Sequence, residues 1–175
     1  MTLTSTRLTT PIGPMLGVAT EEALVLLEFE ERRELARELE DLARDAAIVA
    51  GVNEPLAQLE RELGEYFAGA LAEFRTPLEL RGTAFQRGAW RELLKIPAGT
   101  TITYLQLAHA VGNPRSFRAV AQANGANRIA VVVPCHRVVN TGGGLGGYAA
   151  GLERKRWLLE HERRFFGGRG AGRLF

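Results

Sequence analysis

The chain has 175 residues, of which 46% are apolar and 24% are charged, a composition typical of a folded globular protein rather than a disordered or membrane-spanning one. Its apolar runs are far shorter than the ~20 residues needed to cross a bilayer, and its first residues lack the apolar stretch of a signal peptide. Cys135 is the only cysteine, which excludes an intrachain disulfide. We therefore expect a cytoplasmic enzyme or binding protein.

Charge divides the chain near Leu80. Residues 1–80 carry seven arginines and sixteen acidic side chains, a net charge of −9, whereas residues 81–175 carry fifteen basic and four acidic side chains, a net charge of +11. A basic half of this kind indicates a surface for DNA or another polyanion, although opposite charges can also dock two halves of one fold. We favour the polyanion interpretation.

Residues 1–80 are expected to form a small α+β domain, because short apolar segments between turn signals are followed by leucines at helical spacing. The predicted strands are 3–9, 15–19 and 24–29, and the predicted helices are 31–43 and 53–67. Asn53 is expected to cap the second helix, and residues 68–82 to link this domain to the basic half. The carboxylates of this half show no catalytic spacing, and we expect them to lie on solvated helix faces.

The basic half is predicted to be mainly helical. Its predicted helices are 83–96, 104–111, 115–124 and 151–164. The second and third are short and joined by a glycine-containing turn at 112–114, which is typical of a helix-turn-helix. Alanines at 119, 121 and 123 leave few side chains that could reach base edges, and small residues favour close approach to the minor groove or packing against another element. Arg118 is the long cation in the middle of this helix.

Candidate chemistry is concentrated after Asn127. The high β-branched content of residues 129–133 predicts a buried strand that Pro134 ends, so that Cys135 and His136 follow at the end of the strand. Basic neighbours lower the pKa of a thiol, which makes Cys135 a candidate nucleophile. A single cysteine is also a common core residue, so Cys135 considered alone leaves both interpretations open.

The glycine-rich segment 140–148 is expected to be a loop whose backbone can approach a flat ligand. Gly142, Gly144 and Gly147 fit the spacing of a dinucleotide-binding loop, but too few residues follow to supply the second strand of such a unit. We therefore predict no cofactor. The last predicted helix has an apolar face, with Glu162 near its end.

Taken together, these residues resemble the O6-alkylguanine-DNA alkyltransferase family, also called methylated-DNA–protein-cysteine methyltransferases. The resemblance is strong over about residues 82–162, and 134–138 is its most specific motif. The other matching segments are 82–86, Trp90, 96–99, Tyr104, 112–114, 118–120, Asn127, 147–148, 157–159 and 161–162. The first half is similar to the variable domain of the family.

This resemblance implies an α+β fold with a small N-terminal domain, a sheet plus helices, over 1–80. A mainly helical DNA-binding and alkyltransferase domain would cover 81–165. Residues 166–175 lie beyond the resemblance, and their glycine and arginine content predicts a flexible tail.

The resemblance also implies repair of DNA by irreversible transfer of the alkyl group of O6-alkylguanine to Cys135, once per molecule, with O4-alkylthymine as a further candidate substrate. The lesion base would rotate out of the duplex into a pocket, because its target oxygen is inaccessible in the stack. His136, oriented by Glu162, would activate Cys135 through water. Tyr104 would crowd the phosphate and donate to the guanine ring, and Asn127 would brace the turn before the active-site strand.

Double-stranded DNA is the implied partner, bound through the minor groove, with Arg118 filling the space that the extruded base leaves. The implied DNA-binding residues are Tyr104, Arg115, Ser116, Arg118, Ala119 and Ala123. The implied pocket residues are Val138, Gly147, Tyr148 and Ala149. Many relatives carry serine where this chain has Ala149, so here only the backbone amide could contact the base at that position.

Residues 1–80 contain neither cysteine nor histidine, so we predict no counterpart of the zinc that some relatives bind in this domain. We expect a protein that is monomeric in solution and does not bind membranes. Two alternatives remain. One is a sensor that binds the lesion without repairing it, against which Cys135 argues because such relatives carry tryptophan at that position. The other is a helix-turn-helix regulator with a redox-sensing cysteine, which leaves Glu162 and the glycine-rich loop unexplained.

Overall fold

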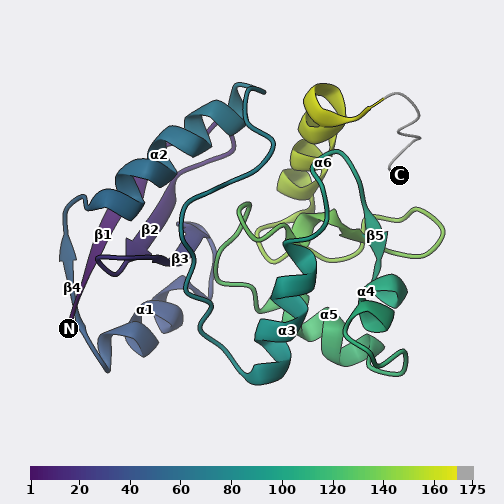
Figure 1. Cartoon of the computed structure of the whole chain (residues 1–175), viewed down its shortest axis with the longest axis horizontal. Coiled ribbons are helices and arrows are strands. Elements are labelled where there is room, and N and C mark those ends of the chain that lie inside the picture. The colour runs from purple at the N-terminus through teal and green to yellow at the C-terminus, as the bar shows by residue number, and fades with distance from the viewer. Residues whose placement is uncertain (169–175) are drawn as a thin grey trace. The chain divides into compact units, whose positions relative to one another are not determined.

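The computed structural model describes residues 1–168, so positions 169–175 of the predicted tail lie outside the described residues. The chain forms two units, Met1–Leu80 and a second unit that begins at Arg81 (Figure 1). The first contains a sheet with helices and the second is mainly helical, which confirms the predicted α+β class. Within the described part of the chain, no helix is both long and apolar enough to cross a membrane.

The first unit is built on a four-stranded sheet. Its elements are β1 Thr2–Leu8, β2 Met15–Ala19, β3 Leu24–Phe29, α1 Leu35–Ala43, β4 Ala47–Ala50 and α2 Glu54–Phe67. The strand order is β3-β2-β1-β4, with β4 parallel to β1 and the other pairs antiparallel. Strand β4 was not predicted, because it is only four residues long, lies at the sheet edge and is mostly exposed, so it lacks an apolar alternation.

The two helices of this unit cover opposite faces of the sheet (Figure 1). On one face, Leu42 of α1 packs in an apolar cluster with Leu3 and Val18. On the other face, Leu56 and Leu59 of α2 lie against Gly17, where a side chain would meet them. Successive residues of β2 therefore face two separate apolar layers, one on each side of the sheet.

Three acidic side chains of the first unit are buried, namely Glu28, Glu38 and Glu62. Arg32 contacts Glu28 and lies 3.7 Å from Glu38. Glu62 accepts hydrogen bonds from the backbone and hydroxyl of Thr76, which fastens part of the predicted linker to α2. The prediction that these carboxylates lie on solvated faces is wrong for all three, because each has polar partners that offset its burial.

The second unit consists mainly of helices. Its elements are α3 Ala84–Leu93, β5 Ile102–Thr103, α4 Tyr104–Ala110, α5 Phe117–Gly125, the 3₁₀ turn η1 Cys135–Arg137, β6 Val138–Val139 and α6 Leu152–Phe166. Strands β5 and β6 pair in parallel. Thr83 and Thr103 each form a capping box, which fixes where α3 and α4 begin. Helix α3 ends at Leu93 rather than at 96, because the last residues before Pro97 form a turn.

The strand predicted over 129–133 is wrong. Ile129 makes an isolated bridge and the following residues form turns, with Val131 at a φ of 70°. The side chain of Asn127 accepts from the backbone N–H of Ile129 at 3.0 Å and donates to the carbonyl of Val133 at 2.8 Å. All five residues of the predicted strand are buried. Their β-branched composition therefore indicated burial and not strand pairing.

Candidate active site

Cys135 is the first residue of η1, directly after Pro134. Its side chain is almost enclosed, because the residue is 7% exposed. Its carbonyl accepts a hydrogen bond of 3.2 Å from Nδ2 of Asn124 on α5, which ties the thiol-bearing turn to the second helix of the predicted helix-turn-helix. Asn124 was not predicted as a site residue, since its role depends on a contact across 11 positions of sequence.

His136 forms a buried pair with Glu162 of α6. Nε2 of the imidazole lies 2.7 Å from Oε1 of the carboxylate. Burial lowers the pKa of His136 despite the opposing charge of Glu162, so the imidazole is neutral near pH 7. A carboxylate can only accept, which places the imidazole proton on Nε2 and leaves Nδ1 as the basic nitrogen. Nδ1 has no hydrogen-bonding partner among residues 1–168.

Arg137 holds the same carboxylate from the other side. Its Nε donates to Oε2 of Glu162 at 2.9 Å, its Nη2 donates to Oε1 at 2.8 Å, and its Nη1 donates to the carbonyl of Ile96 at 2.6 Å. Burial opposes ionisation of Glu162, but His136 and Arg137 outweigh it and hold the pKa of Glu162 well below its usual value. Glu162 is therefore a carboxylate at neutral pH. Arg137 was not predicted as a site residue, although it lies inside the 134–138 motif.

Lys155 is a buried lysine beside this centre. Its Nζ donates to the carbonyl of Val138 at 2.6 Å and to the carbonyl of Gly147 at 3.0 Å, so it joins β6 to the glycine-rich loop. Burial lowers the pKa of Lys155 to about 8. Lys155 was not predicted as a site residue, although Lys155, Leu158 and Glu162 recur at the spacing of one helix face.

Tyr104 is the buried first residue of α4 and lies against the glycine-rich loop. Its ring centroid is 5.9 Å from Nζ of Lys155, and a side chain at Gly146 would meet the ring at 2.9 Å. Burial raises the pKa of Tyr104, and the negative charge of a Cys135 thiolate raises it further. The phenol therefore stays protonated at neutral pH and can donate a hydrogen bond to a ligand in this space.

Helix α5 does not expose all the residues predicted to contact DNA. Arg115, Arg118 and Ala119 are exposed. Ser116 is buried and its hydroxyl donates to the carbonyl of Asn113, so it belongs to the turn.

Ala123 is 2% exposed, and its carbonyl accepts from Nε1 of Trp90 on α3. The packing of α5 against its neighbours covers the side chains of Ser116 and Ala123, so the DNA-binding role predicted for these two residues has no exposed side chain to support it.

The predicted pocket residues lie on both sides of Lys155. Val138 is buried, Tyr148 is partly buried, and Gly147 and Ala149 are exposed on the glycine-rich loop. The carbonyl of Val138, expected to accept from the guanine amine, already accepts from Lys155. A carbonyl oxygen has two lone pairs, so this bond leaves room for a second donor.

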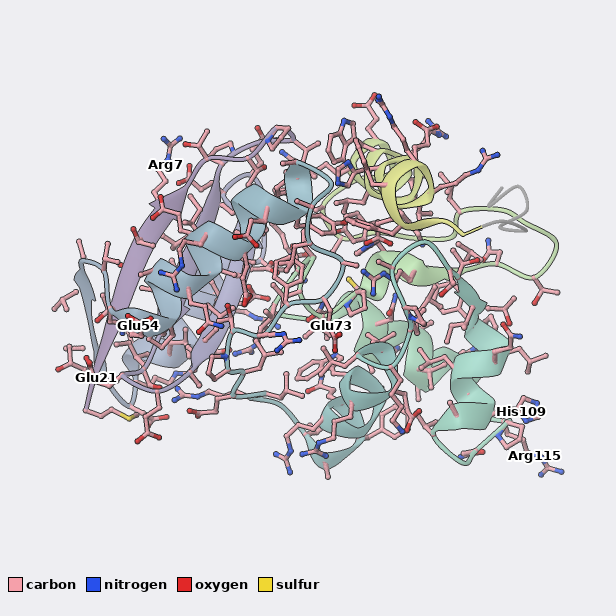
Figure 2. All side chains as sticks on the ribbon, turned by 45° about the horizontal axis from the view of Figure 1, so that its top comes forward. Arg7, Glu21, Glu54, Glu73, His109 and Arg115 are labelled. Atoms are coloured by element: carbon pink, nitrogen blue, oxygen red, sulfur yellow. The ribbon has the colours of Figure 1, made fainter. Side chains whose placement is uncertain are left out.

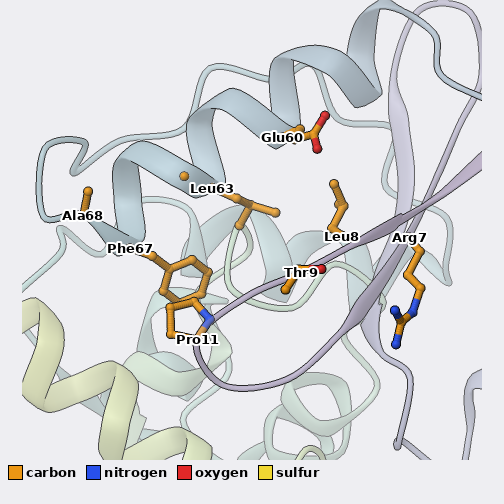
Figure 3. Close-up of a pocket in the computed structure, with 9 residues that line it drawn as sticks. Arg7, Leu8, Thr9, Pro11, Glu60, Leu63, Phe67 and Ala68 are labelled. Carbon is orange, nitrogen blue, oxygen red and sulfur yellow. The ribbon is translucent and has the colours of Figure 1, made fainter.

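A separate pocket in the first unit lacks comparable chemistry. It lies between β1, the turn that follows it and α2 (Figure 3). Its lining includes the side chains of Arg7, Glu60 and Phe67 but no thiol or imidazole. Across residues 1–168, no group of three or more histidine, cysteine or acidic side chains is arranged to hold a metal ion.

Comparison with known proteins gives the same family for both units. Residues 3–80 match the family model "6-O-methylguanine DNA methyltransferase, ribonuclease-like domain", and residues 84–164 match the model "6-O-methylguanine DNA methyltransferase, DNA binding domain". A methylated-DNA–protein-cysteine methyltransferase of Shigella flexneri is 41% identical over 160 residues, which cover 89% of this chain and 93% of the relative.

Relatives from mycobacteria are similar in sequence and in structure. One from Mycolicibacterium paratuberculosis is 54% identical over 103 residues, 59% of this chain and 62% of the relative. The crystal structure of the Mycobacterium tuberculosis O6-methylguanine methyltransferase superposes with a TM-score of 0.81 at 37% identity, covering 93% of this chain and 94% of that one. Another similar crystal structure, of Mycobacterium tuberculosis OGT in complex with DNA, also has a TM-score of 0.81. The chain therefore belongs to the methylated-DNA–protein-cysteine methyltransferase family.

Proposed function

We propose that this protein repairs DNA by moving the alkyl group of O6-alkylguanine to Sγ of Cys135, once per molecule. Membership of the family gives alkyl transfer from DNA to a protein cysteine as the reaction. The observation that carries the assignment is that the chain has a single cysteine, and that this cysteine adjoins the buried pair of His136 and Glu162. No other side chain of the chain can be the acceptor thiol.

The thiol must lose its proton before it attacks the alkyl carbon. Neutral His136 is suited to take that proton at Nδ1 through a water molecule, because Nε2 is committed to Glu162. The imidazolium that forms is stabilised by the Glu162 carboxylate, which Arg137 holds in its charged form. This arrangement follows the logic of other relays of nucleophile, imidazole and carboxylate.

In the transfer step, Sγ of Cys135 attacks the alkyl carbon, an S–C bond forms, and the bond from that carbon to O6 breaks with its electrons moving into the guanine. The guanine leaves as an anion. Tyr104, whose raised pKa keeps the phenol protonated, can donate a hydrogen bond to the ring as this charge develops. Val138, Gly147, Tyr148 and Ala149 are the proposed lining of the base pocket.

Double-stranded DNA is the proposed partner, bound in the minor groove through α5. Exposed Arg118 would fill the space left in the stack when the lesion base enters the pocket. Arg115 and Ala119 are the neighbouring contacts, and Asn127 braces the turn between α5 and η1. O4-alkylthymine is a second proposed substrate, since it presents an alkylated oxygen of the same kind.

All the groups of the proposed reaction lie in one chain, which supports a protein that acts as a monomer. The reaction also requires Cys135 to remain a reduced thiol, and this requirement favours the cytoplasm as the compartment.

Mass measurement after incubation with a duplex that contains O6-methylguanine tests this proposal. Wild-type protein should gain the mass of one methyl group on the peptide that contains Cys135, and Cys135→Ser should gain none. Binding of the lesion without any gain of mass would instead identify a lesion sensor. Equal binding of methylated and unmethylated duplex, again without gain, would identify a regulator.

A further inference from the structure

Phe117 is an exposed aromatic residue at the start of α5. It is 46% exposed although it is a large apolar side chain, and it stands between the exposed residues Arg115 and Arg118. Figure 2 shows Arg115 projecting outward from this end of the molecule. Scattered exposed apolar residues are normal on protein surfaces, so exposure alone assigns Phe117 no role.

The charge of the surface around Phe117 indicates which kind of partner can bind there. No acidic residue occurs in the sequence between Glu92 and Glu153, and α4, the following turn and α5 all lie within that stretch. Arginine supplies the long side chains beside Phe117. A surface of this composition attracts a polyanion, and the family relation to DNA repair identifies that polyanion as DNA.

The second observation is the contact between Phe117 and Tyr104. The two ring centroids are 6.0 Å apart with an interplanar angle of 61°, an edge-to-face arrangement. Tyr104 in turn lies beside Lys155 and Gly146, which border the active site. The exposed ring therefore adjoins the side of the pocket that Tyr104 forms.

Phe117 and Arg118 are neighbours in a helix, so their side chains leave the axis about 100° apart. They cannot both enter the same gap in a base stack. If Arg118 fills the position of the extruded base, the ring of Phe117 meets the duplex to one side of it, toward Tyr104.

We propose that Phe117 is an apolar wedge that packs in the minor groove against the nucleotide flanking the lesion and lowers the free energy of base extrusion. Phenylalanine is one of the side chains that minor-groove proteins insert against base steps to unstack them. This inference rests on the proposed function and adds to it an aromatic contact with the duplex beside Arg118.

Single-turnover repair rates test the wedge. Phe117→Ala should slow repair of an O6-methylguanine duplex about tenfold, which corresponds to about 1.4 kcal/mol of lost extrusion energy. Its reaction with free O6-methylguanine base should change less than about twofold, because a free base needs no extrusion. Phe117→Leu, which keeps an apolar side chain, should recover part of the duplex rate.

Phe85→Ala is the matched control, because Phe85 is also exposed, at 40%, near the start of a helix. It should leave both rates unchanged. A 2-aminopurine placed beside the lesion should brighten on binding wild-type protein, and brighten less with Phe117→Ala.

Three results overturn the wedge. One is an unchanged duplex rate in Phe117→Ala. Another is an equal loss on duplex and free base, which would make Phe117 a support for Tyr104. The third is the same loss in Phe85→Ala. Wild-type protein that takes no methyl group from either substrate would instead overturn the proposed function itself.

Discussion

Replacing Lys155 with methionine tests whether a buried ammonium group holds the glycine-rich loop over the active site. Nζ donates to the carbonyls of Val138 and Gly147. Methionine is similar in length and fills the space, but it cannot donate to either carbonyl. We expect transfer to Cys135 to slow about tenfold or more, because each lost hydrogen bond to a charged group is worth about 1.5–3 kcal/mol.

The same substitution has a predictable effect on stability. Burial lowers the pKa of Lys155 from 10.5 to about 8, so between these values the folded chain has released a proton that the unfolded chain still binds. The free energy of unfolding therefore rises as pH increases from about 8 to 10.5, and this gain is lost when pH falls back through about 8. At about 1.4 kcal/mol per pKa unit, the full rise is about 3 kcal/mol, and the variant lacks it.

Urea unfolding at several pH values between about 7 and 10.5 measures this difference. Both tryptophans, Trp90 and Trp157, lie in the second unit, so their fluorescence reports the unit that contains Lys155. Lys95→Met is the control, because Lys95 is exposed and pairs with Glu92 at the surface. The difference in free energy of unfolding between wild type and Lys155→Met should change across this range. If it stays constant to within about 1 kcal/mol, the titration of Lys155 does not contribute to the pH dependence of stability.

Three further predictions concern DNA and the imidazole pair. Arg118→Ala should reduce repair of duplex far more than reaction with free O6-methylguanine base, because only extrusion needs a residue to fill the stack; equal losses would contradict this role. Glu162→Gln should slow transfer about 100-fold while lesion binding stays nearly intact, since an amide cannot stabilise the imidazolium of His136. If Glu162→Gln transfers at the wild-type rate throughout pH 6 to 8, a range around the ordinary histidine pKa of ~6.5, Glu162 has no part in the mechanism. Affinity for DNA should fall steeply with salt and depend little on sequence, because a half-chain of net charge +11 binds through phosphates; a flat salt response would contradict it.

Local signals explain which elements the sequence could predict. The caps at Asn53, Thr83 and Thr103 act through backbone groups three residues away, and all three mark helix starts in the structure. The segment 129–133 was mistaken for a strand because burial and strand pairing favour the same β-branched residues. Strand β4 left no signal, because its pairing to β1 comes from the sheet rather than from its own pattern.

The residues of the candidate active site also divide into those that the sequence could predict and those that it could not. His136 and Glu162 were expected to pair from the resemblance, and they lie 2.7 Å apart. Arg137, Lys155 and Asn124 were missed, because their roles arise from contacts between segments distant in sequence. A sequence shows that a lysine or arginine is present but does not show that folding buries it against a carbonyl or a carboxylate.

In the proposed reaction, Cys135 accepts one alkyl group and is then spent. The product is a thioether, whose carbon is not activated toward water and whose sulfur offers no route comparable to thiol–disulfide exchange. The chain has no second cysteine that could take the group onward.

Titration with excess O6-methylguanine duplex tests this single turnover, by counting repaired lesions against active protein. We predict a plateau at one repaired lesion per molecule, with one methyl group on Cys135. Repair that continues linearly beyond that plateau would show that the methyl group does not stay on Cys135.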